Sequence, residues 1–147
     1  MTYKRPESVL VVIHTPTLEI LLLERADHPG WWQSVTGSLE NDETPSQAAQ
    51  REVQEETGLT MPYAHLHDWQ QINRYEIYTE FRYRYASGVT HNVEHVFSLQ
   101  VPTTLEIIIA PKEHLHYRWM TANEAAERCF SPSNAAAIRQ LQKTCYG

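Results

Sequence analysis

Residues 37–59, with the sequence GSLENDETPSQAAQREVQEETGL, constrain the fold of this chain more than any other segment. Thr44 suits the N-cap of a helix, Pro45 suits its first position, and Gln47 completes a capping box with Thr44. Gly58 suits the stop, because glycine readily adopts the left-handed conformation that commonly ends a helix. The segment therefore predicts a helix that begins at Pro45 and ends before Gly58.

The predicted helix carries an apolar side and an acidic side. Ala49 and Val53 lie four residues apart, so they share a face that can be buried. Glu52, Glu55 and Glu56 fan out beside that face. Like charges at these spacings destabilise a helix by roughly 0.2–0.5 kcal/mol per pair, so their concentration needs an explanation.

Two interpretations account for this negative charge. In the first, the acidic side is an ordinary solvated helix face, on which Arg51 pairs with Glu55 one turn later. In the second, the carboxylates share a hard divalent cation such as Mg²⁺. This ion prefers oxygen ligands and is commonly held by one or two carboxylates together with substrate phosphates. Such a cation would turn the repulsion into attraction.

The rest of the chain predicts an α/β fold. Strands are expected at 8–13, at 18–25, within 65–85, at 94–101 and at 116–120. A further helix is expected after a capping box formed by Thr121 and Glu124. The final helix is expected after Ser131, with Pro132 at its first position. These elements favour a sandwich around a mixed β-sheet, and the length fits one domain spanning 1–147.

Charge and composition argue against several classes of protein. The net charge of −6 disfavours a general affinity for nucleic-acid backbones, so an anionic substrate needs local neutralisation at its site. No apolar run approaches the roughly 20 residues that cross a bilayer. The start MTYKRPESVLVVI is interpreted as a first strand rather than a signal peptide. Cys129 and Cys145 fit two reduced thiols in a cytoplasmic protein.

The spacing within residues 37–59 forms a longer pattern. Its fixed positions are Gly37, Glu43, Arg51-Glu52-Val53, Glu55-Glu56 and Gly58-Leu59. This pattern resembles a complete Nudix box, and the resemblance implies a Nudix-type α/β/α sandwich with a mixed β-sheet. It also implies hydrolysis of a nucleoside diphosphate linked to another moiety. The implied cofactor is Mg²⁺, with Mn²⁺ as a substitute.

The same resemblance implies roles for the acidic residues. Glu52 and Glu56 are expected to bind the metal, and Glu55 is expected to bind it or to orient water; Glu55 and Glu56 are both counted as catalytic. Outside the box, the segment APKEHLHYRW offers Glu113 as an additional metal ligand or general base. The alternative for Glu113 is a solvated loop acid.

Four further positions of the box are expected to support the site. Arg51 and Glu43 are expected to brace the loop and helix by pairing with each other. Gly37 and Gly58 are expected to have backbone roles, where a Cβ would obstruct. A cation bridging the phosphate oxygens would withdraw charge from them and favour in-line attack by water.

Segments outside the box resemble one group of bacterial Nudix hydrolases. YKRPESVLVVI, WWQSVTGSLE, RYASGVTHNVEHVFSL and EHLHYRWM are similar to the dihydroneopterin triphosphate diphosphatases. The resemblance implies removal of pyrophosphate from 7,8-dihydroneopterin triphosphate, which leaves the monophosphate in a step of folate biosynthesis. Asn41 and Asp42 replace the glycine or acid usual in that group, at positions that the box leaves free.

Several residues are expected to bind the substrate. Lys4 precedes the first strand and Arg25 ends the second, so either can grip phosphate. Thr36 offers a hydroxyl, and Ser131 contacts the ligand if the last helix begins at the cleft. The alternatives are solvated surface charges for Lys4 and Arg25, an ordinary strand residue for Thr36, and simple helix capping for Ser131.

A pterin ring needs an apolar slot with a few polar groups. The segment RYEIY, residues 74–78, supplies Tyr75 and Tyr78 for stacking. The backbone of Glu76 and Ile77 is expected to form hydrogen bonds with the ring edge. The alternative is that these aromatic residues belong to the core of a strand pair.

Other functions remain open at this point. Other Nudix substrates are (d)NTPs and diadenosine polyphosphates. Tyr75, a tyrosine some distance after the box, leaves diadenosine polyphosphates open as an alternative substrate. A non-catalytic nucleotide-sensing domain is disfavoured, because the glutamates of the box are all present. Paired histidines at 65–67 and 114–116 are interpreted as structural rather than as zinc ligands. We expect a small-molecule substrate and neither a nucleic-acid nor a membrane partner; the sequence leaves the oligomeric state open.

Overall fold

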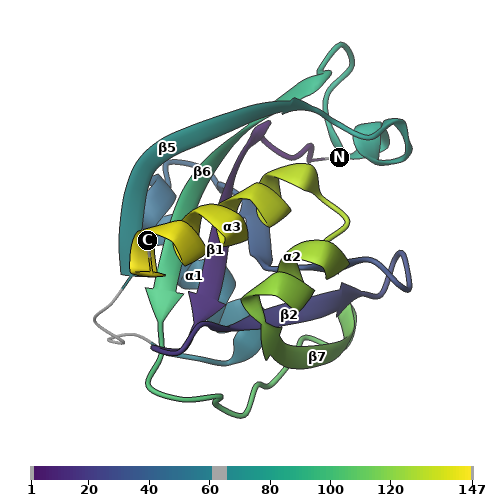
Figure 1. Cartoon of the computed structure of the whole chain (residues 1–147). Coiled ribbons are helices and arrows are strands. Elements are labelled where there is room, and N and C mark those ends of the chain that lie inside the picture. Colours follow the sequence, from purple (N-terminus) through teal and green to yellow (C-terminus); the bar gives the residue numbers. More distant parts are fainter. Residues whose placement is uncertain (1, 61–65, 147) are drawn as a thin grey trace.

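The chain forms a mixed β-sheet with helices on both faces (Figure 1). The structure is a computed structural model that describes residues 2–60 and 66–146, without the side chains of 145 and 146. The strands are β1 Glu7–His14, β2 Glu19–Arg25, β3 Trp32–Gln33, β4 Val35–Ser38, β5 Leu66–Glu76, β6 His91–Gln100 and β7 His114–Thr121. The helices are α1 Pro45–Thr57, α2 Ala122–Arg128 and α3 Pro132–Tyr146, with a 3₁₀ helix η1 at Thr79–Arg84.

Strand β1 lies at the centre of the sheet, whose order is β3-β2-β1-β6-β5. It pairs in parallel with β6 along its whole length, from Glu7 opposite Val93 to His14 opposite Gln100. The first half of β1 also pairs antiparallel with β4, and β7 pairs antiparallel with β2. Strand β1 therefore pairs both with β4, which carries Gly37, and with β6, whose first residues are polar.

The side chains of β1 alternate between two cores. Val9, Val11 and Ile13 point toward α1 and form one buried cluster with it. Leu10 and Val12 point the other way, into a cluster closed by α2 and α3. Figure 1 shows α3 crossing one face of the sheet while α1 lies behind it. The predicted α/β/α sandwich with a mixed sheet is confirmed.

Helix α1 has the limits that its end signals predict. The Thr44 hydroxyl accepts a hydrogen bond from the backbone N–H of Gln47, and the Gln47 side chain accepts one from the backbone N–H of Thr44. Gly58 adopts a left-handed conformation with φ of 74°. Ala49 and Val53 are buried, as predicted. Local chemistry therefore fixes the start and the end of this helix.

The strand prediction for 65–85 is correct for β5 and wrong for its second half. Residues Thr79–Arg84 form η1, in which the N–H of Phe81 donates to the carbonyl of Tyr78 at 2.9 Å. The alternation in FRYRY, residues 81–85, resembles a strand. However, residues three apart share a face in a 3₁₀ helix, and this brings Tyr78 and Phe81 together.

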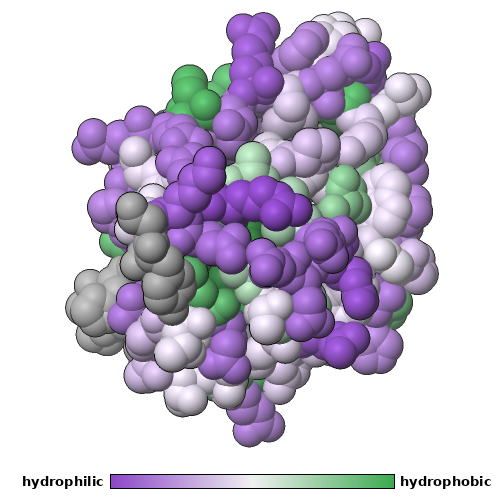
Figure 2. Space-filling view, in the orientation of Figure 1, coloured by the Kyte–Doolittle hydropathy of each residue, from purple (hydrophilic) through white to green (hydrophobic). Residues whose placement is uncertain are grey.

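The two late helices begin where they were expected. The Thr121 hydroxyl accepts from the backbone N–H of Glu124 at 3.2 Å, and the Asn134 N–H points at the Ser131 hydroxyl at 3.5 Å. Hydrophilic side chains cover most of the face that α3 crosses (Figure 2). Within 2–60 and 66–146, the helices are too short or too polar to cross a membrane. His65 and the side chain of Cys145 lie outside the described residues.

Candidate active site

A cleft of about 1040 Å³ opens between α1, the ends of β4, β5 and β6, η1 and the start of α3. Most of the predicted site residues line it: Lys4, Arg25, Thr36, Gly37, Arg51, Glu52, Glu55, Glu56, Tyr75, Ile77, Tyr78, Glu113 and Ser131. Three predicted residues lie outside its lining: Glu43, Gly58 and Glu76. The fold thus gathers residues that are more than 120 positions apart into one space.

The acidic end of the cleft is centred on Glu56. This residue is 1% exposed, and neither carboxylate oxygen has a hydrogen-bond partner among the described residues. Burial raises the pKa of Glu56 well above its ordinary value, and the nearby charges of Glu52 and Glu113 raise it further. His114 Nε2 lies 3.5 Å from Glu56 Oε1 without forming a hydrogen bond. An unpartnered buried carboxylate of this kind is costly unless something else binds it.

Arg51 organises the carboxylates around it. Its guanidinium donates to Glu43 at 2.7 and 2.9 Å, to Glu52 at 2.7 Å and to Glu55 at 3.2 Å, and it also reaches the carbonyl of Ser38 at 3.0 Å. The pairing expected between Arg51 and Glu43 is therefore present, and the guanidinium lowers the pKa of Glu43. These contacts tie α1 to the loop that precedes it.

The remaining carboxylates of this end are more open to solvent. Glu55 is about half exposed. Partial burial raises the pKa of its carboxyl group, and the charge of Glu52 raises it further. Glu113 lies in the loop before β7, where its carbonyl accepts from the N–H of Ala26 at 2.9 Å. Its exposed side chain lines the cleft and lies near enough to Glu56 to affect its ionisation.

These residues fit a hard divalent cation. The two oxygens of Glu56 have no hydrogen-bond partner among the described residues and lie near the acids Glu52 and Glu113, and carboxylates are the ligands that such ions prefer. In the described part of the chain, no group of three acidic, histidine or cysteine side chains is already assembled around one point. Arg51 holds one oxygen of Glu52 at 2.7 Å, so a cation there would compete with Arg51 for that carboxylate.

Cations surround the other wall of the cleft. Arg25 donates to Asp27 through two nitrogens at 2.6 and 2.7 Å, and Arg84 donates to the same carboxylate at 2.8 Å. Lys4 joins this group, since its backbone N–H donates to the carbonyl of Arg84 at 2.9 Å. Desolvation by the cleft walls lowers the pKa of the Lys4 amine, and the charge of Arg84 lowers it further. The two hydrogen bonds from Arg25 to Asp27 fix the position of the Arg25 guanidinium at the cleft.

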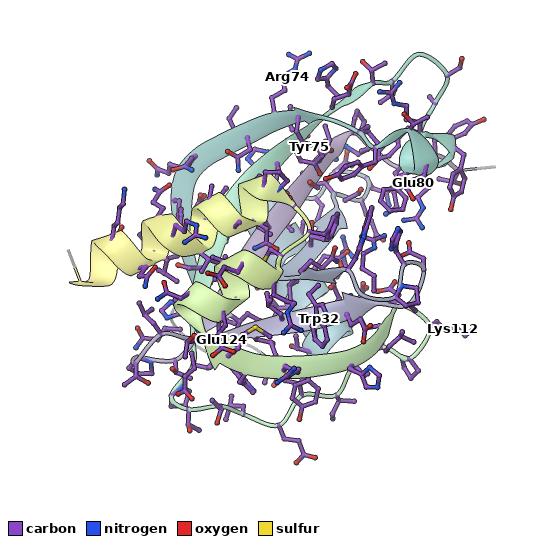
Figure 3. All side chains as sticks on the ribbon, turned by 45° about the vertical axis from the view of Figure 1, so that its right-hand side comes forward. Trp32, Arg74, Tyr75, Glu80, Lys112 and Glu124 are labelled. Atoms are coloured by element: carbon purple, nitrogen blue, oxygen red, sulfur yellow. The ribbon has the colours of Figure 1, made fainter. Side chains whose placement is uncertain are left out.

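The predicted pterin-binding residues differ in what they offer. Tyr75 points from β5 into the molecule, whereas Arg74 points away (Figure 3). The Tyr75 hydroxyl accepts a hydrogen bond from Asn92 at 3.0 Å. The backbone of Ile77 is already used, because its N–H donates to Thr90 and its carbonyl accepts from Arg82. The N–H and the carbonyl of Ile77 therefore both have partners within the protein.

The remaining predicted substrate-binding residues also have contacts within the protein. Glu76 lies away from the cleft and pairs with Arg82 at 3.1 Å. The Thr36 hydroxyl donates to the carbonyl of Val9 at 2.8 Å, so it can offer a ligand only its lone pairs. The Ser131 hydroxyl lies 3.1 Å from that of Ser133 at the start of α3.

Aromatic rings border the cleft beside the arginines. Trp31 stacks on Phe130 with ring centroids 4.4 Å apart, and Tyr78 and Phe81 pack against Trp31 at 5.7 and 6.1 Å. The Arg25 guanidinium lies 4.8 Å from the centre of the Phe81 ring. Three of these rings line the cleft, so it has an aromatic wall next to a basic one.

Several residues of the cleft could not be predicted from the sequence. They include Arg84, Asn92, Glu94, Phe130 and Asn134. A weak signal existed for Glu94, because it is an acidic residue at the start of the strand predicted at 94–101. The two histidines of the 114–116 segment lie in different places. His114 is buried beside Glu56, whereas His116 is exposed and its Nδ1 lies 2.8 Å from a carboxylate oxygen of Glu24.

Comparison with known proteins gives consistent matches. The model of the NUDIX domain matches residues 4–141. Dihydroneopterin triphosphate diphosphatase from Escherichia coli strain K12 is 46% identical over 142 residues, which are 95% of this chain and 93% of that protein. The enzyme of the same name from Haemophilus influenzae is 43% identical over 143 residues, covering 95% and 89%. The solved E. coli dihydroneopterin triphosphate pyrophosphohydrolase superposes with a TM-score of 0.90 at 45% identity, covering 95% and 97%.

Proposed function

The chain belongs to the NUDIX domain family, and we propose that it hydrolyses 7,8-dihydroneopterin triphosphate to the monophosphate and pyrophosphate, a step in folate biosynthesis. One water is consumed and one phosphoric anhydride bond is broken. The observation that carries the proposal is a single cleft that joins the carboxylates of α1 to a basic and aromatic wall. At about 1040 Å³ it has room for a bicyclic ring together with a triphosphate.

A divalent metal is part of this activity, as it is generally for Nudix hydrolases, and we propose Mg²⁺ with Mn²⁺ as a substitute. Glu52, Glu56 and Glu113 would hold it. When bound, the cation neutralises the polyphosphate and lowers the pKa of water for attack on phosphorus. The burial of Glu56 among other acids supports this assignment, because a cation would relieve their mutual repulsion.

The protein's own groups supply the remaining steps. Glu55 and Glu113 border the acidic end and lie open enough to orient the attacking water and to accept its proton. Glu56 lies buried at the base of the cleft. Arg51 and Glu43 fix the orientation of the helix carboxylates, and the left-handed turn at Gly58 ends the helix behind them.

The basic wall is assigned to the phosphates. Lys4, Arg25 and Arg84 face the cleft from the N-terminal segment, β2 and η1. Asp27 holds the two guanidinium groups in place, which reduces the conformational entropy lost when they bind phosphate. The pyrophosphate leaving group then departs with its charge matched by these cations. Tyr75, Ile77, Tyr78, Thr36 and Ser131 are assigned to the remainder of the substrate.

The chain acts on a small molecule with phosphate groups. We further propose that residues 1–147 form one functional domain and that nucleic acid is not its ligand, which the net charge of −6 supports. A cytoplasmic location, expected from the cysteine content, stays a prediction.

Mass spectrometry of the products formed in H₂¹⁸O with Mg²⁺ tests the proposal. We expect dihydroneopterin monophosphate and pyrophosphate as the initial products, with one ¹⁸O atom in the product that comes from the attacked phosphorus. Release of orthophosphate as the first product would contradict this reaction. The same assay with (d)NTPs and diadenosine tetraphosphate covers the alternatives. Faster cleavage of diadenosine tetraphosphate would overturn the pterin assignment, and no turnover of any substrate would favour a sensing domain.

A further inference from the structure

Glu94 is a buried carboxylate at the end of the cleft formed by β6 and α3. It is 4% exposed and lines the cleft. Its Oε1 atom accepts hydrogen bonds from the Ser133 hydroxyl at 2.9 Å and from Asn73 Nδ2 at 3.3 Å. Its Oε2 atom accepts none from the residues that the structure describes. One oxygen is thus fixed and the other remains available.

The carboxylate of Glu94 has no counterion nearby in the part of the chain that the structure describes. Across 2–60 and 66–146, no lysine, arginine or histidine side chain lies within ion-pairing distance of it. Burial raises its pKa, and the hydrogen bonds from Ser133 and Asn73 oppose that shift. A buried carboxylate without a cation destabilises the fold, so its position calls for a role.

Asn92 adds a second acceptor two residues earlier on β6. Its Nδ2 donates to the Ser8 hydroxyl at 2.7 Å and to the Tyr75 hydroxyl at 3.0 Å. Its Oδ1 is buried and has no partner among the described groups. Residues two apart on a strand share a face, so Asn92 and Glu94 present their free oxygens from the same side of β6.

This site lies on the other face of the sheet from the acidic residues of α1. Glu94 is opposite Ser8 in the β1–β6 ladder, and Gly37 is opposite Val9, one residue further along β1. Successive side chains of β1 point to opposite faces, so Glu94 lies on the face that α3 covers, whereas Glu52 belongs to α1 on the other face. Since the cleft is lined by both, a ligand with a triphosphate at one end and a ring at the other can reach both.

We propose that Glu94 is the specificity-determining residue for a fused 2-amino-4-oxopyrimidine ring, its free Oε2 atom accepting hydrogen bonds from the ring N–H and the adjacent 2-amino group. This inference rests on the proposed function and deepens it by naming how the ring is recognised. Guanine carries the same pair of donors. Adenine instead places a ring acceptor beside its amino group, which would face the carboxylate with a repulsive lone pair.

The Glu94→Gln variant tests this assignment. Glutamine keeps the size of the side chain but can turn an N–H₂ group toward the donor edge of the ring. We expect KM for dihydroneopterin triphosphate to rise by about 30-fold, the scale for a hydrogen bond to a charged group, with little change in kcat. Glu127→Gln, on the exposed side of α2, is the matched control and should leave both constants unchanged. An unchanged KM in folded Glu94→Gln would overturn the inference.

A comparison of GTP with ITP tests the same contact from the ligand side. The two nucleotides differ only in the 2-amino group, so wild-type enzyme should show about tenfold higher kcat/KM for GTP. That ratio should approach one in Glu94→Gln. Equal rates with wild-type enzyme would overturn the inference even if the variant failed to fold. If the wild-type enzyme did not cleave the pterin substrate, the proposed function would fail, and the nucleotide ratio would still decide the role of Glu94.

Discussion

Gly37 on β4 leaves the space that the carboxylate of Glu52 occupies. A Cβ placed on Gly37 would collide with the carboxyl carbon and both oxygens of Glu52. Gly37 pairs with Val9 in the β1–β4 ladder, so its backbone cannot easily retreat. The glycine is therefore required by the close approach of the helix carboxylate to the strand.

Gly37→Ala should displace Glu52 from its position beside Arg51. We expect pyrophosphate release to fall by about 100-fold, since small displacements at a site have effects of this size. Unfolding in urea should show a loss of about 1–3 kcal/mol from overpacking. Gly88→Ala is the control, because its φ of 90° carries a backbone cost without any crowding. It should lose about 1 kcal/mol and keep full activity. Full activity in Gly37→Ala would show that the carboxylate does not need this position.

Asn134 fastens the start of α3 to the sheet. Its Oδ1 accepts from the backbone N–H of Ser34 at 2.7 Å, and its Nδ2 donates to the Ser34 hydroxyl at 3.0 Å. Both residues are buried. Asn134→Ala leaves a buried N–H unpaired and should lower the free energy of unfolding by about 2–3 kcal/mol. Ser34→Ala should cost only about 1 kcal/mol, because the backbone bond survives. Equal losses in chemical denaturation would contradict this division.

Asp27 should make the stability of the protein depend on pH in the acid range. Hydrogen bonds from Arg25, with burial opposing them, lower the pKa of Asp27 from 3.8 to about 2. A depressed folded-state pKa stabilises the fold above the unfolded value, and this contribution disappears as pH falls from about 4 to about 2.

Asp27→Asn therefore should lose about 1 kcal/mol at pH 7, since solvent screens a carboxylate that is one-third exposed. The difference from wild type should shrink below pH 4 in urea titrations. Asp42→Asn, which changes an exposed acid in the loop before α1, is the control and should keep the wild-type stability at pH 7. A constant difference for Asp27→Asn down to pH 2 would contradict the assignment.

Cys129 should react slowly with thiol reagents. Burial raises the pKa of its thiol to about 12, from an ordinary value of 9.0. At pH 8 the reactive thiolate is then about 1,000-fold scarcer than in an ordinary thiol. A Cys145→Ser variant isolates Cys129, and its reaction with Ellman's reagent should be at least about tenfold slower than that of glutathione, because the greater nucleophilicity of a high-pKa thiolate offsets only part of its scarcity. A rate equal to that of glutathione would contradict the buried environment.

Local signals explain why α1 was predictable and η1 was not. Thr44, Pro45 and Gln47 act on neighbouring backbone groups, so the start of α1 follows from adjacent residues. The FRYRY segment has an alternation that suits a strand, whereas the 3₁₀ helix that forms packs Phe81 against the distant residues Trp31 and Arg25. Local patterns therefore specify elements best where capping is unambiguous.

The candidate site likewise contains some residues that the local sequence predicts and others that it does not. The spacing of Glu52 and Glu56 on one helix predicted a shared acidic face, and the structure places both at the cleft. The contacts of Arg84 with Asp27 and of Asn134 with Ser34 join residues 57 and 100 positions apart. Nothing in the local sequence sets such distances, because they depend on how the sheet brings its strand ends together.

We propose that the carboxylates of α1 hold a divalent cation against a polyphosphate. The most direct test measures Mg²⁺-dependent pyrophosphate release by Glu56→Gln beside wild type and Glu127→Gln, with circular dichroism to monitor the fold. We predict a loss of at least about 100-fold in Glu56→Gln alone, with an unchanged spectrum. Unchanged turnover in Glu56→Gln would contradict the claim.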